Sequence, residues 1–337
     1  MTKKKVLILK NDRGGDLLNS ISCISTLLTR DNDVTIYLSD FNFGFKFLFK
    51  NANIKKINYN LNLTDKLVIF LHILINKYDE VFILTPKNYY YYLPLFFKKI
   101  KFFGITVDGV KRNRPKKYLK NLLYKYVTIN RKKINNKSSS ELQNELVKND
   151  YKFDKRLSNI SKPELKKFIQ ENIPNKFIFI QYKENFYDKI NLSDKNFSRF
   201  LNLIGGNENI IFSSDIELNP TNIFFYENHR VIDCEKNILK NTNYKKNITY
   251  LHNIDSENLF ALIEKSHKII SPHGLITHMC KFYNKSSINL FNFKIINNDE
   301  FKHQKIAFSE WYKNMSIKFL FLNNDIDRTI KKINKNL

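Results

Sequence analysis

The segment 4–30, KKVLILKNDRGGDLLNSISCISTLLTR, restricts the fold more than any other part of the chain. An apolar strand is expected over residues 6–9, and a polar loop with Gly14, Gly15 and Asp16 follows it. Leucine and isoleucine then recur at helical spacing. A strand, a glycine turn and a helix start form the first corner of a doubly wound α/β domain, whose ligands bind at the carboxyl ends of the strands. The loop residues are therefore the first candidates for chemistry.

Strand and helix patterns alternate along both halves of the chain. In the first half, strands are expected at 6–9, 34–38, 56–59, 80–84 and 100–103, and helices at 16–29, 41–51, 64–77, 88–98 and 138–148. In the second half, strands are expected at 177–181, 209–212, 230–232, 268–271, 287–290 and 318–322, and helices at 193–204, 255–265, 275–283 and 325–336. Such alternation predicts parallel sheets covered on both faces.

The two halves predict two facing Rossmann-like domains, residues 1–155 and 156–337, with a cleft between them. A polar junction over 150–175 separates them, and the last helix is a candidate to pack back on the first domain. The 337 residues, 42% of them hydrophobic, suffice for two cores. The longest apolar run, 67–75, is interrupted by His72 and flanked by lysines, so we expect a buried helix there rather than a membrane span.

Three scattered cysteines predict neither a disulfide framework nor a zinc site, and the apolar part of the N-terminus is too short for a secretory signal. Both features favour a reducing cytoplasm. The net charge of +25 is concentrated between residues 87 and 137, which hold fifteen Lys or Arg and one acid. This basic face indicates an anionic partner, and codon bias toward lysine is the alternative.

Asp16 follows the carboxyl end of a parallel strand, where it can act as a general base toward an acceptor hydroxyl. Arg13, Gly14 and Gly15 complete this acceptor-side loop. The alternative role for Asp16 is to accept N–H groups at the helix start, a common use of aspartate. Gly14 and Gly15 do not form the GxGxxG dinucleotide fingerprint.

A second strand–turn–helix pattern, 269–278, predicts a phosphate site. His273 and Gly274 lie in the turn, the helix starts at Leu275, and Thr277 and His278 can add side-chain donors. Alternatively, the turn is only structural and His278 packs inside. Two lysines, Lys183 and Lys189, follow the strand at 177–181 and can neutralise a diphosphate. The alternative is that both are only solvated surface charges.

The stretch 88–103, NYYYYLPLFFKKIKFF, combines aromatic and basic residues. This composition suits a membrane interface, a sugar-phosphate acceptor or single-stranded nucleic acid, and equally a helix with buried aromatics. Two DxD tripeptides, at 31–33 and 325–327, fall at a turn and at a helix start. We expect no metal at either.

At this point the chain resembles the heptosyltransferase family, glycosyltransferase family nine. Members open with a strand, a turn ending in Gly-Asp and an apolar helix, and this chain opens in a similar way with KVLILKNDRGGDLLNSISCISTLL. Members also have a strand–turn–helix late in the chain, and a similar pattern is found here in LFALIEKSHKIISPHGLITHMCKFYNKSSINLF. The resemblance implies a GT-B fold and inverting, metal-independent transfer from a nucleotide-diphosphate sugar, without a further cofactor. It implies that Asp16 is the base, that Gly274, Thr277 and His278 lie at the donor diphosphate, and that Lys189 contacts phosphate.

The family's Asp-Thr-Gly turn is altered here, since Pro272 or His273 stands in the place of its Asp. The turn also resembles that of the family sixty-one transferases. The resemblance implies a cytoplasmic enzyme on the inner membrane surface, with an anionic lipid-linked or phosphorylated saccharide of the cell envelope, such as lipopolysaccharide, as acceptor. A non-catalytic GT-B relative that binds glycan or nucleotide is the alternative. A nucleic-acid partner is the least expected, and it would require affinity that falls steeply with salt.

Overall fold

The computed structural model describes residues 3–28, 31–108, 117–130, 139–147, 160–187, 192, 194–204, 208–214, 220–245, 247–292, 317–322 and 326–337. They form two compact units: described residues up to Lys162 belong to the first, and those from Pro163 onward belong to the second. The expected boundary at 155–156 lies outside the described residues. None of the helices within these ranges has the length and apolarity to cross a membrane.

The first unit is built on a parallel sheet with strand order β3-β2-β1-β4-β5-β6. Its strands are β1 (Lys5–Lys10), β2 (Asp33–Ser39), β3 (Asn53–Ile57), β4 (Glu80–Ile83), β5 (Lys101–Asp108) and β6 (Lys125–Asn130). The chain starts in the middle, builds outward to β3, and returns to place β4 on the other side of β1. The direction of winding therefore reverses between β1 and β4, which is where doubly wound sheets open a crevice for ligands.

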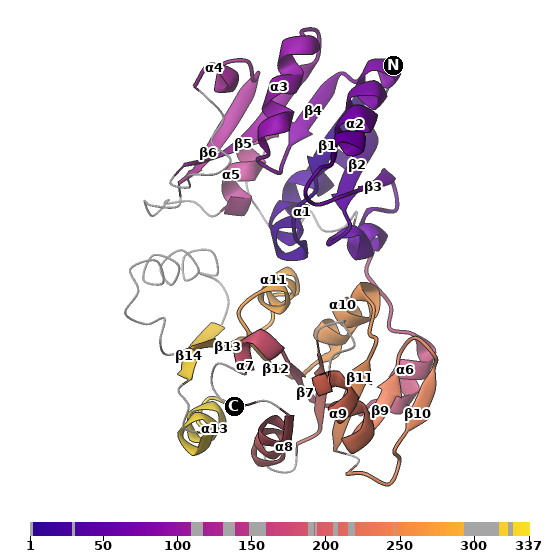
Figure 1. The fold of residues 1–337 in the computed structure, drawn as a ribbon, viewed down its shortest axis with the longest axis vertical. Coiled ribbons are helices and arrows are strands. Elements are labelled where there is room, and N and C mark those ends of the chain that lie inside the picture. Colours follow the sequence, from indigo (N-terminus) through magenta and orange to yellow (C-terminus); the bar gives the residue numbers. More distant parts are fainter. Residues whose placement is uncertain are drawn as a thin grey trace. The chain divides into compact units, whose positions relative to one another are not determined.

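The helical segments described beside this sheet are α1 (Gly14–Leu28), the 3-10 helix η1 (Phe43–Phe49), α2 (Leu63–Asn76), α3 (Asn88–Phe96), α4 (Lys117–Lys120) and α5 (Ser139–Leu146). Helix α1 packs against α5. Helices α2, α3 and α4 share one apolar cluster with Leu7 and Leu9 of β1, so they cover the same face of the sheet (Figure 1). Val6 and Ile8 point to the opposite face because side chains alternate along a strand.

The second unit has an eight-stranded sheet with order β10-β9-β11-β8-β7-β12-β13-β14, in which only β10 is antiparallel to its neighbour. Its strands are β7 (Ile178–Gln181), β8 (Ile210–Ser213), β9 (Arg230–Asp233), β10 (Ile238–Lys240), β11 (Ile248–His252), β12 (Lys268–Pro272), β13 (Ser287–Asn292) and β14 (Ile317–Leu322). Its helices are α6 (Lys167–Asn172), α7 (Glu184–Tyr187), α8 (Asp194–Leu203), α9 (Pro220–Asn228), α10 (Ser256–Lys265), α11 (Leu275–Phe282) and α13 (Ile326–Asn334).

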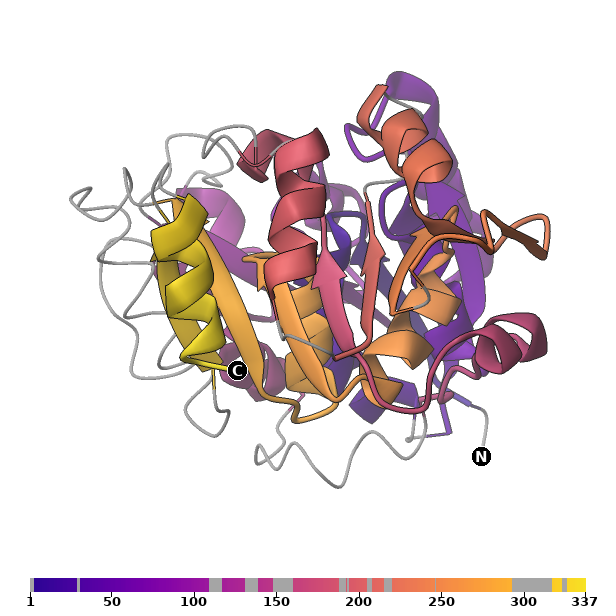
Figure 2. The same cartoon turned by 90° about the horizontal axis from the view of Figure 1, so that it is seen from below.

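Aromatic rings fill much of the core of the second unit. Phe197 and Phe200 of α8 and Phe225 of α9 pack in one cluster with Ile330 and Ile333 of α13. The last helix, α13, therefore packs on the second unit itself, where the Asn334 amide donates to the Leu203 carbonyl at 3.0 Å (Figure 2).

Several expected elements differ from the observed ones. The strand expected at 56–59 lies at Asn53–Ile57, the helix expected at 41–51 is a 3-10 helix, and β6 and β11 were not expected. The expectation of a buried helix over 67–75 is wrong. The segment is helical, as α2, but only Ile69 and Ile73 are buried, and most of its other aliphatic side chains are exposed. The sheet covers one face of α2, and none of the described elements of the first unit covers the other.

Candidate active site

The loop between β1 and α1 stands at the carboxyl end of the central strand of the first unit. Arg13 and Asp16 are exposed there, Gly14 is buried and Gly15 is half-buried. The Leu17 N–H donates to the Arg13 carbonyl at 3.0 Å and closes the first turn of α1. Because the helix begins at Gly14, Asp16 is its third residue and lies at the positive end of the helix dipole.

The Asp16 carboxylate takes part in no hydrogen bond or ion pair within the described part of the chain, and the Ser20 hydroxyl bonds the Asp16 backbone carbonyl instead, at 3.2 Å. The alternative role for Asp16, a carboxylate used to cap the helix, therefore has no hydrogen bond to support it among these residues. An exposed carboxylate at the carboxyl edge of the sheet is available to a ligand.

Beneath this loop lies a buried ion pair that the sequence did not indicate. Lys10 is 2% exposed, and its Nζ lies 2.5 Å from Asp12 Oδ2 and 3.1 Å from the Leu84 carbonyl. Burial raises the pKa of Asp12 to about 6, against the effect of Lys10, and the nearby charge of Asp16 raises it further. The only sequence signal was an aspartate placed two residues beyond an apolar strand.

The other carboxylate oxygen of this pair, Asp12 Oδ1, is buried and has no hydrogen-bond partner among the described residues. The Thr85 hydroxyl is near enough to lower the pKa of Asp12, but it too lacks a bond of normal geometry in the same part of the structure. Because β1 and β4 are neighbours, these two groups meet where the sheet order reverses. A ligand hydroxyl reaching this point would find an unused acceptor.

Side chains from β2, from the residues that follow it and from α3 hold the loop in place. The Asn42 amide donates to the Lys10 carbonyl at 2.9 Å, and the Ser39 hydroxyl donates to the Asp12 carbonyl at 2.5 Å. The Tyr90 hydroxyl donates to Asn11 Oδ1 at 2.8 Å. The loop is thus held from β2 and α3, and a carboxylate placed on it is pre-positioned.

A cation and two aromatic rings continue the same edge of the sheet. Lys87, just before α3, holds its Nζ 4.4 Å from the ring centroid of Tyr59, and the Phe41 ring meets Tyr59 edge-on at 5.2 Å. Partial burial lowers the pKa of Lys87, and Asp12 is among the carboxylates that oppose this shift. Phe41 is 65% exposed. The combination suits an anionic saccharide: a ring can stack on a sugar face, and an ammonium can pair with phosphate.

In the second unit, the turn between β12 and α11 brings two of the expected residues together. The Lys183 ammonium, from the end of β7, lies 3.5 Å from the position that a Cβ on Gly274 would occupy. The two strands are parallel neighbours, which explains the meeting. Helix α11 begins at the next residue, Leu275, so free N–H groups and a lysine ammonium converge on one point.

Thr277 holds this turn rather than facing outward. It is fully buried, its hydroxyl accepts the Gly274 N–H at 3.3 Å, and its own proton goes to Asn289 Oδ1 on β13. The Thr277 side chain is therefore engaged in the turn as both acceptor and donor, and its expected bond to phosphate stays a prediction.

His273 and His278 flank the same turn as neutral rings. Burial lowers the pKa of His273 to about 3, with the charges of His278 and Lys183 adding to the effect. Burial also lowers the pKa of His278 to about 3, with a contribution from Lys281. Both residues are half-buried, and the ring of His273 stacks on Phe291 with centroids 5.3 Å apart. At neutral pH these rings can exchange hydrogen bonds with a ligand but bring no charge.

Lys189, the other lysine expected at the donor, lies outside the described residues. Further along the carboxyl edge of this sheet, residues that were not expected gather at the ends of β9 and β11. Asp233 is 1% exposed, and its Oδ2 has no hydrogen-bond partner among the described residues. Nearby, His252 is nearly buried and Tyr250 bonds the Ser214 hydroxyl at 2.6 Å. This cluster was not expected from the sequence because β11 was not predicted.

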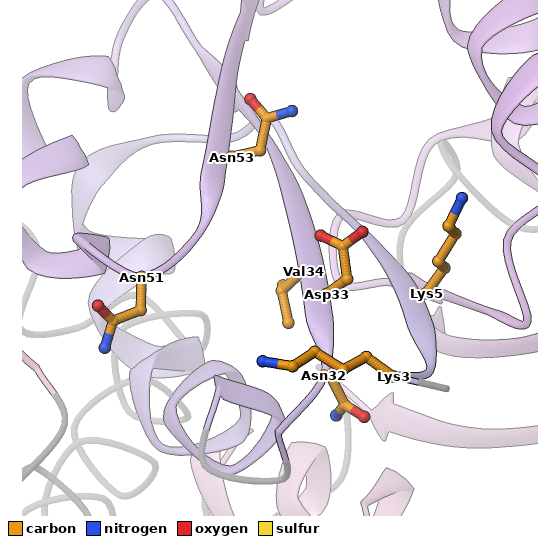
Figure 3. Close-up of a pocket in the computed structure, with 7 residues that line it drawn as sticks. All are labelled: Lys3, Lys5, Asn32, Asp33, Val34, Asn51 and Asn53. Atoms are coloured by element: carbon orange, nitrogen blue, oxygen red, sulfur yellow. The ribbon is translucent and has the colours of Figure 1, made fainter. Parts of the chain in front are cut away.

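A shallow hollow of about 500 Å³ lies away from these groups (Figure 3). Lys5, Asp33 and Asn53 line it at the amino ends of β1, β2 and β3, the edge opposite to Asp16. Ligands of parallel sheets bind at the other edge, so we assign this hollow no part in function. Among the described residues, no three His, Cys, Asp or Glu side chains gather as a metal site.

A scan against protein-family models returns no match, and neither does a search of curated proteins. Solved structures do match. Heptosyltransferase WaaC of Escherichia coli, solved with ADP-2-deoxy-2-fluoro heptose, has a TM-score of 0.62 and 10% identity over 99% of this chain and 100% of that chain. Escherichia coli ADP-heptose lps heptosyltransferase II gives 0.61 and 11% over 98% of each chain.

A UDP-GlcNAc 2-epimerase from Methanocaldococcus jannaschii gives a TM-score of 0.54 and 13% identity over 98% of this chain and 91% of that chain. At such identities the matches concern the fold. They confirm the expected α/β architecture of two mostly parallel sheets. In its fold, this chain is similar to the heptosyltransferases, GT-B glycosyltransferases, over nearly its whole length.

Proposed function

We propose that this protein is a glycosyltransferase that moves a sugar from a nucleoside-diphosphate donor to an acceptor hydroxyl, with inversion and without a metal. The observation that carries the proposal is the meeting of the Lys183 ammonium with the start of α11 at Gly274. A glycine at this point lets a phosphate approach the backbone closely, and the N–H groups and the ammonium supply the positive potential that a departing diphosphate requires.

In the proposed reaction, Asp16 accepts the proton of the acceptor hydroxyl. The hydroxyl oxygen forms a bond to the anomeric carbon of the donor sugar as the bond from that carbon to the diphosphate oxygen breaks. The electron pair of the broken bond leaves with the nucleoside diphosphate, next to Lys183, with Lys189 as a second cation. Attack from the side opposite to the leaving group inverts the anomeric centre.

The acceptor in this proposal is an anionic saccharide of the cell envelope, either phosphorylated or lipid-linked. Lys87 over Tyr59, with Phe41 exposed beside them, supports this choice. The excess of lysine and arginine in the sequence between residues 87 and 137 supports it further, because a segment rich in positive charge attracts an anionic partner. The donor nucleoside would lie along the ends of β9 and β11, where Asp233 keeps an unused acceptor oxygen.

Donor binding and transfer test the proposal separately. A thermal-shift series with ADP, UDP, GDP and CDP identifies the donor class, because a ligand at a hundred times its Kd stabilises the folded state by about 2.7 kcal/mol. Lys183→Met should abolish the shift. Asp16→Asn should keep the shift but lower transfer of the matching nucleotide sugar by about 10²- to 10⁴-fold.

Asp31→Asn is the matched control, since Asp31 is also exposed but pairs with Lys3 at the opposite edge of the sheet. It should leave both the donor shift and the transfer rate unchanged. A wild-type protein that turns over no nucleotide sugar would contradict the proposal. Binding without turnover would instead favour a non-catalytic GT-B relative, a role suggested by the missing carboxylate in the turn before Gly274.

A further inference from the structure

Helix α2 is apolar on two faces, and only one of them is covered. Ile69 and Ile73 point into the core of the first unit. The outward side chains recur about every four residues and remain 46–73% exposed: Leu63, Leu67, Val68, Leu71, Leu74 and Ile75. An apolar helix face is ordinarily packed against a neighbouring element or in contact with lipid. Among the described elements of the first unit, none covers the outward face of α2.

The apolar surface continues onto α3. The Phe70 ring of α2 lies with its centroid 5.6 Å from that of Phe96 and 4.9 Å from that of Phe97, so the two helices adjoin. Leu95 and Phe96 of α3 are 43% and 66% exposed. We call these two residues and the six exposed residues of α2 the α2–α3 face. Soluble monomers rarely expose so large a contiguous apolar patch without a function for it.

Positive charge borders this face. Lys77 follows α2, Lys98 and Lys99 follow α3, and all three are exposed. The one acid in the sequence of α2, Asp65, lies in its first turn, where its carboxylate accepts hydrogen bonds from Asn58 and Asn62. At the C-terminal ends of the two helices the exposed charges are these three lysines, and the nearest acid, Asp79, accepts the Lys5 N–H. Leucines and a phenylalanine bordered by lysines match the surface of an anionic bilayer, where acyl chains take the apolar groups and headgroups take the ammonium ions.

We propose that the α2–α3 face docks on an anionic lipid membrane, with both helices lying in the interfacial plane. The two helices start directly after β3 and β4, so their first turns adjoin the edge of the sheet that carries Asp16 and Lys87. Docking would therefore hold that edge beside the lipid surface, within reach of a lipid-linked acceptor. The docking itself does not depend on sugar transfer.

Vesicle co-sedimentation of the full chain tests this proposal. The vesicles contain phosphatidylethanolamine with one third phosphatidylglycerol, and phosphatidylcholine vesicles serve as the neutral comparison. Each leucine that leaves water contributes about a tenfold change in partition, so Leu67→Gln/Leu71→Gln should bind about 100-fold more weakly. Both side chains are exposed, so the fold should persist with an unchanged urea midpoint.

Leu203→Gln/Ile223→Gln is the matched control: two aliphatic side chains on helices of the second unit, 44% and 49% exposed. It should bind anionic vesicles like the wild type. Lys98→Gln/Lys99→Gln should remove most of the preference for anionic over neutral vesicles, as should raised salt.

Three results would overturn the proposal. The first is wild-type protein that stays in the supernatant, and the second is a control double variant that loses as much binding as Leu67→Gln/Leu71→Gln. The third is a dimer in sedimentation velocity that Leu67→Gln/Leu71→Gln converts to monomer while vesicle binding is unchanged. That outcome would assign the α2–α3 face to a second copy of the chain.

Discussion

Replacing Lys10 by methionine should destabilise the first unit by about 3–5 kcal/mol at pH 8, because it leaves a buried carboxylate without its counter-ion. Lys10 is almost fully buried, and its Nζ contacts only Asp12 and the Leu84 carbonyl among the described groups. The remaining carboxylate would keep one oxygen that already lacks a partner in that region. Such a loss is a large part of the 5–15 kcal/mol that stabilises a typical domain.

The loss should depend on pH in a defined direction. The pKa of Asp12 is raised to about 6 by burial even with Lys10 present, and removal of Lys10 raises it further. At pH 5 the folded variant can protonate Asp12 and relieve most of the penalty, whereas at pH 8 it cannot. Adding Asp12→Asn to Lys10→Met should recover stability at pH 8, since no buried charge then remains.

Urea titrations followed by circular dichroism at pH 5 and pH 8 measure these differences. Lys4→Met is the matched control, because Lys4 pairs with Glu80 at 2.7 Å on the surface, where such pairs contribute about 0–1 kcal/mol. A Lys10→Met variant that loses the same stability at both pH values would refute the argument. So would a double variant no more stable than Lys10→Met alone.

Three further predictions concern a buried histidine, the cysteines and the turn at Gly274. Burial lowers the pKa of His229 to about 4, so the contribution of this side chain to stability is complete above pH 6.5 and is lost as the pH falls toward 4. In urea titrations, the difference in unfolding free energy between wild type and His229→Leu should therefore shrink by about 2 kcal/mol from pH 8 to pH 5. All three cysteines are buried, and burial raises the pKa of Cys280 to about 12. A disulfide reagent at pH 8 should therefore label no thiol until the protein is unfolded, and rapid labelling of the native protein would contradict this prediction. In Gly274→Ala, the new Cβ would lie 3.5 Å from the Lys183 ammonium without a clash, so the melting temperature should stay within a few degrees of the wild type. The affinity for the nucleoside diphosphate should fall by about tenfold, because the added methyl group hinders the approach of the phosphate. Unchanged affinity would show that the phosphate does not bind at this turn.

The sequence patterns located strands well where a strand is buried on both faces. Val6 to Leu9 form a continuous apolar run, the pattern of a central parallel strand, and Ile269 and Ile270 are the apolar centre of β12. They failed for β6, KYVTIN, and β11, ITYLH, because these strands are short and carry polar residues within lysine- and asparagine-rich sequence. The pairing of β11 between β8 and β9 decided its conformation, and that information is not local.

Local motifs also predicted part of the candidate site. Asp16, Lys183 and Gly274 each come within a few residues of the end of a strand, so their place at a carboxyl edge could be inferred. The Lys10–Asp12 pair could not be inferred, because its environment includes the Leu84 carbonyl, 74 residues from Lys10. The open face of α2 was missed for a related reason: Leu67 and Ile69 have the same apolar character, and only the assembled sheet determines which of them is covered.

The strand order of the two sheets determines how early during synthesis each unit can complete its fold. The sheet of the first unit is complete once β6 has emerged from the ribosome, and α5 can then pack on α1. In the second unit, β7 emerges early but pairs with β12, and α13 closes the core against α8 across 131 residues. The aromatic core of the second unit therefore cannot be completed before α13 has been synthesised. A nascent chain then carries the completed sheet of the first unit ahead of an incomplete second unit.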